Sequence, residues 1–120
     1  MKENDLSKRT KSFALRIMKL IGALPNTVAG RAIGGQLIRS GMSVSANYRA
    51  ACRARSRAEF IAKLGIVEEE ADETVYWIEL LIDAGIVQLT RVRDLLKEAD
   101  EIIAITVSSI KSAKGLRKAH

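Results

Sequence analysis

Hydrophobic residues recur at three- and four-residue steps through most of the chain, which is the period of amphipathic helices and not of strands. The first such segment covers about residues 5–24, where Leu6, Phe13 and Ile17 mark one stripe and lysines occupy the opposite side. Pro25 follows and lacks the backbone N–H that a continuing helix needs. A first helix is therefore predicted to end just before Pro25.

The second predicted helix, about residues 28–54, has an inner stripe unusually rich in small residues, among them Gly30, Gly34 and Gly41. Either Asn26 or Thr27 is expected to cap its start. Each glycine inside a helix costs roughly 1 kcal/mol relative to alanine. The glycines therefore predict close approach of a neighbouring helix.

Two further helices follow from their end signals. Ser56 and Glu59 match a capping box, which predicts a third helix over about 57–84, ended by Gly85. Thr90 is the expected cap of a fourth helix over about 90–113, and residues 114–120 form a basic tail. The pattern predicts an all-α fold, a single antiparallel up-down-up-down four-helix bundle spanning residues 1–120.

Composition agrees with one small helical domain and argues against an enzyme. The 120 residues are 48% hydrophobic and 28% charged, with one proline and 4% aromatic residues. Cys52 and His120 are the only cysteine and histidine, so no internal disulfide, zinc set or His-dependent triad is expected. Cys52 falls on the inner stripe and is expected to be buried. No catalytic residue, cofactor or metal site is predicted.

An acidic cluster and the absence of long apolar segments narrow the function further. Glu69, Glu70, Asp72 and Glu73 lie close together, but a di-metal bundle would also need histidines inside the domain. No run of about 18 apolar residues is present, and the N-terminus does not resemble a signal peptide. We therefore expect a cytoplasmic protein without membrane attachment.

Charge is strongly segregated along the chain. Residues 1–57 carry 12 basic and 2 acidic side chains, whereas residues 58–101 carry 4 basic and 12 acidic ones. The first two helices are therefore expected to lie beside acidic partners. If the second and third helices form a hairpin, Arg39 comes near Asp72 or Glu73, which makes these three the structural ion-pair candidates.

A second group of cations suggests a binding surface. The candidate nucleic-acid-binding residues are Arg49, Arg53, Arg55, Arg57, Lys111, Lys114, Arg117 and Lys118. Arginine suits phosphate because its planar guanidinium offers a fork of donors. The alternative is that these side chains only solvate one end of the bundle.

The core stripe predicted for the third helix consists of Phe60, Leu64, Val67, Ala71, Val75, Ile78 and Ile82, and the helix also carries a second hydrophobic row beyond it. This row, at heptad spacing, consists of Ile66, Glu70, Glu73, Trp77, Leu80 and Ala84. A monomeric bundle needs one stripe per helix, so the second row predicts burial against another helix or another subunit. We favour the subunit, and these residues are the oligomer-interface candidates.

Three short segments carry a family resemblance. They are residues 35–40 with the Arg39-Ser40 pair, residues 44–48 with Asn47, and residues 56–60 with the Ser-x-x-Glu-Phe start of the third helix. In these segments the chain resembles the four-helix-bundle proteins encoded in intervening sequences of bacterial 23S rRNA genes. Many relatives follow the asparagine with Ala-Glu-Gly, whereas this chain continues with Tyr48-Arg49-Ala50-Ala51.

The resemblance implies a fold and an assembly more than an activity. Members of the family form ring-shaped homopentamers and carry no enzymatic activity. More distantly, the chain is similar to accessory proteins of diversity-generating retroelements, which bind nucleic acid and a reverse transcriptase. The function predicted is a non-enzymatic homo-oligomeric scaffold that binds RNA or DNA without sequence preference, and the alternative is a protein-binding adaptor with no nucleic-acid role.

Overall fold

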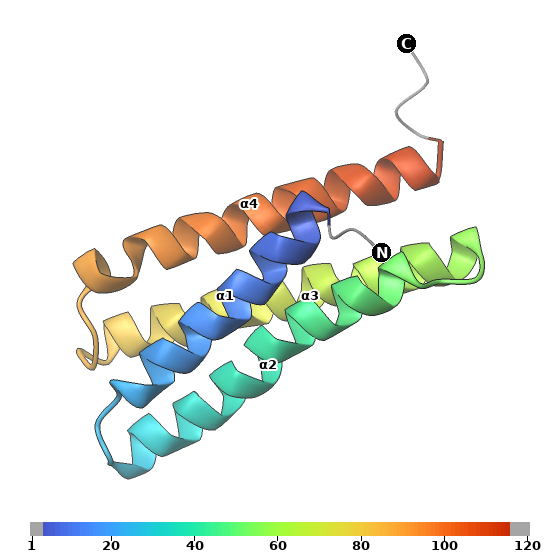
Figure 1. The fold of residues 1–120 in the computed structure, drawn as a ribbon. Helices are drawn as coiled ribbons and strands as arrows, with labels where there is room; N and C mark the ends of the chain where they lie inside the picture. The colour runs from blue at the N-terminus through green and yellow to red at the C-terminus, as the bar shows by residue number, and fades with distance from the viewer. Residues whose placement is uncertain (1–3, 116–120) are drawn as a thin grey trace.

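The computed structural model describes residues 4–115, which form four helices and contain no strand. These are α1 (Asp5–Gly22), α2 (Val28–Cys52), α3 (Arg57–Asp83) and α4 (Leu89–Ala113). Each helix runs antiparallel to the one before it, and α1 lies inclined against α2 and α4 (Figure 1). Helices that follow one another pack together, and α1 also contacts α4. The predicted four-helix bundle is confirmed.

The first two helices begin at side-chain caps and end close to the expected positions. Asn4 Oδ1 accepts a hydrogen bond from Ser7 N at 2.8 Å, and Thr27 Oγ1 accepts one from Gly30 N at 3.0 Å. Thr27, not Asn26, is therefore the cap of α2. α1 ends at Gly22, two residues early, because the proline at position 25 disfavours helical geometry at Leu24.

The last two helices differ from expectation mainly at the start of α4. Ser56 Oγ accepts from Glu59 N at 3.0 Å, while the Glu59 carboxylate accepts from Arg55 N, so the capping box closes on the residue before Ser56. Gly85 has φ +73° and ends α3 as predicted. Thr90 does not cap α4, because the helix begins one residue before it and Gln88 occupies the cap without a side-chain bond.

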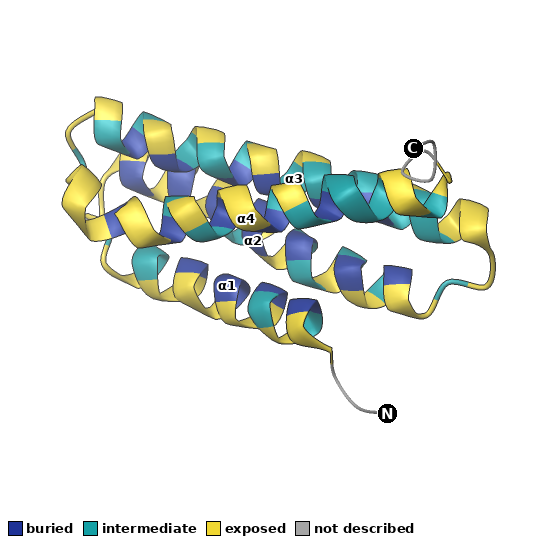
Figure 2. Ribbon diagram, turned by 90° about the horizontal axis from the view of Figure 1, so that it is seen from above, coloured by how far each residue is buried: buried dark blue, intermediate teal, exposed yellow. Residues whose placement is uncertain are grey.

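The core is one apolar cluster that runs between the helices. Buried residues line the inner side of every helix, and exposed ones face outward (Figure 2). The largest fully buried side chains include Phe13, Ile17, Leu37, Leu64, Ile78, Leu81 and Ile102. On α3 the buried stripe is turned slightly from the predicted one: Thr74 and Leu81 are fully buried, whereas Val75 and Ile82 are half-buried.

Glycines let α1 lie directly on α2. A Cβ added at Gly41 would come within 2.9 Å of Ile17 Cγ2, and one added at Gly30 would lie 2.3 Å from the carbonyl oxygen of Pro25. Gly34 faces Ile21 and Leu24 at ordinary contact distance. The small residues of α2 therefore have the predicted packing role against α1. Among the described residues, every helix is too short or too polar to cross a lipid bilayer.

Candidate nucleic-acid interface

Four arginines lie where α2 turns into α3. Arg49 is in the last turn of α2, Arg53 caps its C-terminus, Arg55 is in the connection, and Arg57 begins α3. All four are exposed. The turn is short because Arg53 and Ala54 close the helix end and Ser56 at once caps the next helix. The local sequence therefore concentrates four guanidinium groups at one end of the bundle.

α4 brings two lysines to the same end. Its C-terminal turns lie beside the start of α3, at the end of the bundle where α2 turns into α3 (Figure 1). Lys111 and Lys114 are exposed there. Arg117 and Lys118 lie outside the described residues. Six of the eight predicted cations thus lie at one end of the bundle, which we call the basic end: Arg49, Arg53, Arg55, Arg57, Lys111 and Lys114.

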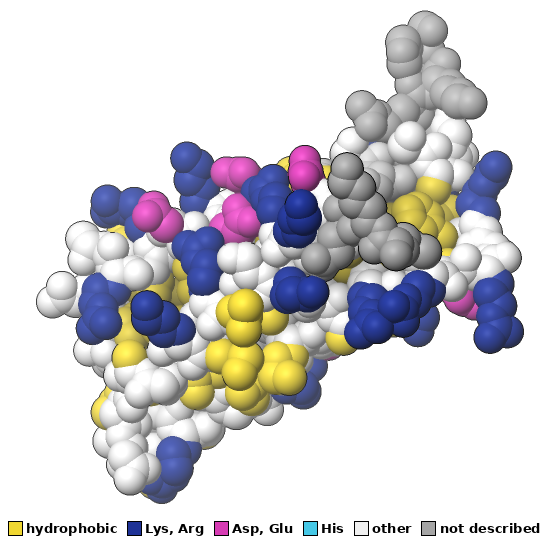
Figure 3. Space-filling model, viewed as in Figure 1, with side chains coloured by type: hydrophobic (Ala, Val, Ile, Leu, Met, Phe, Trp, Pro, Cys, Tyr) yellow, Lys and Arg dark blue, Asp and Glu magenta, His cyan; other side chains and the backbone are white. Residues whose placement is uncertain are grey.

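The side chains of the basic end lack acidic partners. Among residues 4–115, none of the six makes a side-chain hydrogen bond or ion pair. Figure 3 shows Lys and Arg side chains gathered at this end with little acidic surface between them. Glu59 is the acid of the first turn of α3, and its carboxylate accepts from the backbone of Arg55. These cations therefore stay available to an anionic ligand.

Arg9 behaves differently, because α4 neutralises it. Its guanidinium donates to Glu98 at 2.7 and 3.0 Å and to Glu101 at 2.8 Å. These hydrogen bonds hold the pKa of Glu98 below its ordinary value and raise that of Arg9. This clip joins α1 to α4 and was not predicted. Only the charge segregation along the chain hinted that basic α1 would face acidic α4.

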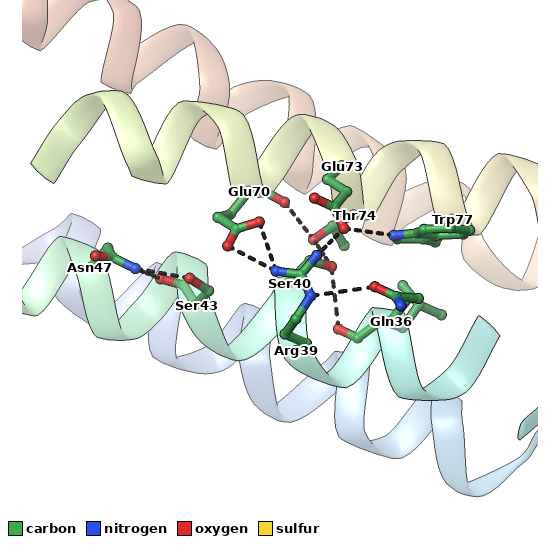
Figure 4. A network of polar contacts seen from close by, with 10 residues as sticks. Gln36, Arg39, Ser40, Ser43, Asn47, Glu70, Glu73, Thr74 and Trp77 are labelled. Carbon is green, nitrogen blue, oxygen red and sulfur yellow. Dashed lines mark hydrogen bonds and ion pairs between the residues drawn. The ribbon is translucent and has the colours of Figure 1, made fainter. Parts of the chain in front are cut away.

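Arg39 is likewise neutralised, within the hairpin of α2 and α3. Figure 4 shows its guanidinium directed at Glu70 and Glu73, with Nη1 lying 3.0 Å from Glu70 Oε2. Of the two predicted partners, Glu73 pairs with Arg39, whereas Asp72 is exposed and Glu70 is the second partner. Asp72 points outward because it lies about 160° around the helix from Glu70.

The second hydrophobic row of α3 already meets α2 of the same chain. Glu70 and Glu73 bind Arg39, and Trp77 donates its indole N–H to Glu73 at 3.0 Å. Trp77 and Leu80 are half-buried against the core, and Ile66 is half-buried too, whereas Ala84 is exposed. A contact of this row with a second subunit stays a prediction, and part of the row already contacts α2 of the same chain.

Cys52 is exposed, so the prediction of a buried thiol is wrong. It lies at the last residue of α2, where Asn4 from the start of α1 donates to its sulfur at 3.8 Å. Tyr48, one turn earlier, is buried and donates to Asn4 Oδ1 at 3.3 Å. Burial, with a hydrogen bond to Cys52, raises the pKa of Tyr48 to about 12. The periodicity could not show that Cys52 is the last residue of α2, at the end of the bundle.

Comparison with known proteins shows the family. The family model described as 23S rRNA-intervening sequence protein matches residues 2–108. The chain belongs to this family. The resemblance seen in the sequence is thereby confirmed, and the match covers all of α1, α2 and α3 and most of α4.

A solved structure extends the likeness to three dimensions. The chain is similar to a protein of unknown function from the S23 ribosomal protein family of Bacteroides thetaiotaomicron VPI-5482, at 37% identity and a TM-score of 0.81. The alignment covers 88% of this chain and 98% of that one. No curated protein matches. The comparisons therefore establish the family and the fold, and the function has to be inferred from the surface of the protein.

Proposed function

We propose that this member of the 23S rRNA-intervening sequence protein family is a non-enzymatic, homo-oligomeric scaffold that binds RNA or DNA through the phosphates. One observation carries the proposal: the six cations of the basic end have no acidic partner among the described residues. Arg9 and Arg39, which have such partners, are used to hold helices together. The basic end instead presents its charge to solvent.

The chemistry of the basic end favours phosphate over bases. Arginine donates two parallel hydrogen bonds to phosphate oxygens. Reading of single-stranded bases usually needs exposed aromatic rings to stack on. Near this end Tyr48 is buried and Phe60 is half-buried. Binding is therefore expected to follow the backbone, with little preference for sequence and with a strong dependence on salt.

The test is a fluorescence-anisotropy titration of a mixed-sequence RNA duplex and of its DNA counterpart at several salt concentrations. For the wild type, log Kobs falls linearly with log salt, as release of counterions from phosphates requires. The triple variant Arg53→Ala, Arg55→Ala, Arg57→Ala is expected to bind more weakly. Its salt slope is expected to be shallower by up to about 3, because each lost phosphate contact removes about 0.9 from the slope.

A matched control separates local from overall charge. The variant Lys19→Ala, Arg91→Ala, Arg93→Ala removes three exposed cations that lie toward the other end of the bundle. It is expected to retain most of the affinity and nearly all of the slope. An equal loss in both triple variants would show that net charge alone drives binding. No binding by the wild type, together with a salt-insensitive protein complex, would favour the adaptor function.

Self-association is the second part of the proposal, and exposed apolar side chains support it. Leu15, Met18, Met42 and Tyr76 are each about half or more exposed, at 59, 46, 47 and 54%. Single exposed apolar residues are ordinary, but grouped ones mark binding surfaces. The expected result is a wild-type mass in sedimentation equilibrium that is a multiple of the 13.2 kDa chain.

A further inference from the structure

An apolar surface lies along the joint between α1 and α2. Ile17 packs on Gly41, and the residues that follow them in α1 and α2, Met18 and Met42, are both exposed, as is Leu15 one turn before Met18. In Figure 3 hydrophobic side chains form a patch near the centre of this face, where Figure 1 places α1 and α2 side by side. The patch is too large to be explained by one isolated side chain.

A groove continues this surface toward the α1–α2 turn. Its volume is about 340 Å³, and its lining includes Ile21, Leu24, Gly34, Gly35 and Ile38. A Cβ added at Gly35 would meet nothing within 4 Å, so the groove is open above this residue.

The rim of the groove is basic. The lining also includes Arg31, whose guanidinium donates to the side chain of Asn26 and to no carboxylate among the described residues. We call the apolar patch and this basic groove together the receiving face.

The outer side of α3 carries features opposite to those of the receiving face. Tyr76 is the only exposed aromatic residue in residues 4–115. Its ring stands edge-on to that of Trp77, with the ring centroids 5.0 Å apart. Asp72 and Glu79 lie one turn before and after it, and Asp83 one turn further on. All three are exposed and make no ion pair within the described part of the chain. We call this surface the tyrosine face.

We propose that the tyrosine face of one copy docks on the receiving face of the next copy, with Tyr76 against the groove and its carboxylates facing Arg31. The inference rests on the proposed self-association and assigns its surfaces. The occupant is a second copy because the apolar, basic half and the aromatic, acidic half of the contact are both present in one chain. A contact between two different faces is heterologous, so repetition generates a ring when the rotation closes.

The first arm of the test blocks each face separately. Met42→Glu places a carboxylate in the receiving face, and Tyr76→Lys replaces the aromatic ring by a cation. Each variant alone is expected to sediment as a 13.2 kDa monomer, with the helical circular dichroism of the wild type. Both residues are exposed, so neither substitution disturbs the core. Leu89→Glu is the matched control, since Leu89 is 44% exposed at the start of α4 and belongs to neither face.

The second arm mixes the two blocked variants. Met42→Glu retains its tyrosine face and Tyr76→Lys retains its receiving face, so the mixture is expected to form one-to-one heterodimers and nothing larger. Leu15→Glu serves in place of Met42→Glu if that variant aggregates. Assembly of either single variant at the wild-type mass, or a mixture that stays monomeric, would overturn the pairing of these faces. A monomeric wild type would instead overturn the proposed self-association itself.

Discussion

Single atoms decide how closely α1 and α2 approach. Gly41 has no side chain where Ile17 presses against the α2 backbone, and Ile17 is fully buried. Gly65 on α3 differs, because a Cβ added there would meet nothing within 4 Å. The two glycines therefore have different effects on packing and stability. One makes room for a neighbour, whereas the other only weakens its helix.

Replacing these two glycines should therefore change stability in opposite directions. Gly41→Ala forces Ile17 aside and is expected to lower the free energy of unfolding, because overpacking costs about 1–3 kcal/mol against a helix-propensity gain of about 1 kcal/mol. Gly65→Ala keeps only the gain. Urea unfolding of both variants measures the difference, and a Gly41→Ala protein as stable as the wild type would contradict the packing argument.

At the scale of elements, a buried polar pair ties α2 to α3. Thr74 Oγ1 lies 2.9 Å from Ser40 Oγ and 2.8 Å from the carbonyl oxygen of Glu70. Thr74 and Ser40 are both fully buried. The Arg39 network with Glu70 and Glu73 lies beside this pair on the more exposed side (Figure 4). Polar groups with specific partners fix which residues of two helices face each other.

A double-mutant cycle tests this tie. Thr74→Val leaves the Ser40 hydroxyl with only the carbonyl oxygen of Leu37, 3.5 Å away, and is expected to cost about 1–2 kcal/mol of unfolding free energy. Ser40→Ala removes the other partner. The double variant is expected to lose clearly less than the sum of the two single losses, because each single variant already breaks the shared bond. Additive losses in urea unfolding would show that the two hydroxyls act independently.

At the scale of the whole molecule, charge segregation does two different things. Between α1 and α4, opposite charges pair in the clip that Arg9 forms with Glu98 and Glu101. Between α2 and α3, they pair where Arg39 meets Glu70 and Glu73. At the basic end the same excess of cations meets no carboxylate in the described residues. The asymmetry between these regions, more than the net charge of +6, is what supports a phosphate-binding end.

The clip makes stability depend on pH. Because Arg9 lowers the pKa of Glu98 in the folded state, the unfolded chain binds protons more readily at this site. The contribution is complete above the ordinary glutamate pKa of about 4.3 and is lost as pH falls through the lower folded value. Glu98→Gln is expected to weaken the fall in stability over that acidic window. Chemical unfolding at a series of pH values measures it, with Glu69→Gln as an exposed control that has no ion pair within the described residues.

Much of the fold could be predicted because its signals act over a few residues. Ser56, Gly85 and Pro25 begin or end helices through their own backbone chemistry, and the apolar stripes identify the inner faces. Thr74 escaped the core prediction because its buried hydroxyl is satisfied by Ser40, a residue 34 positions away. The basic end could be named in advance, since its four arginines are neighbours in sequence.

The sequence by itself determined the four helices, their inner faces and the separation of basic from acidic segments, because caps, breakers and periodicity depend on nearby residues alone. Only the tertiary structure decided which charges pair, that Glu70 and not Asp72 meets Arg39, and that Cys52 faces outward. The physical reason is that these outcomes depend on the rotation and tilt of each helix against its neighbours. Successive positions on a helix point about 100° apart, so the rotation of each helix decides which of several nearby carboxylates faces a cation on the next helix.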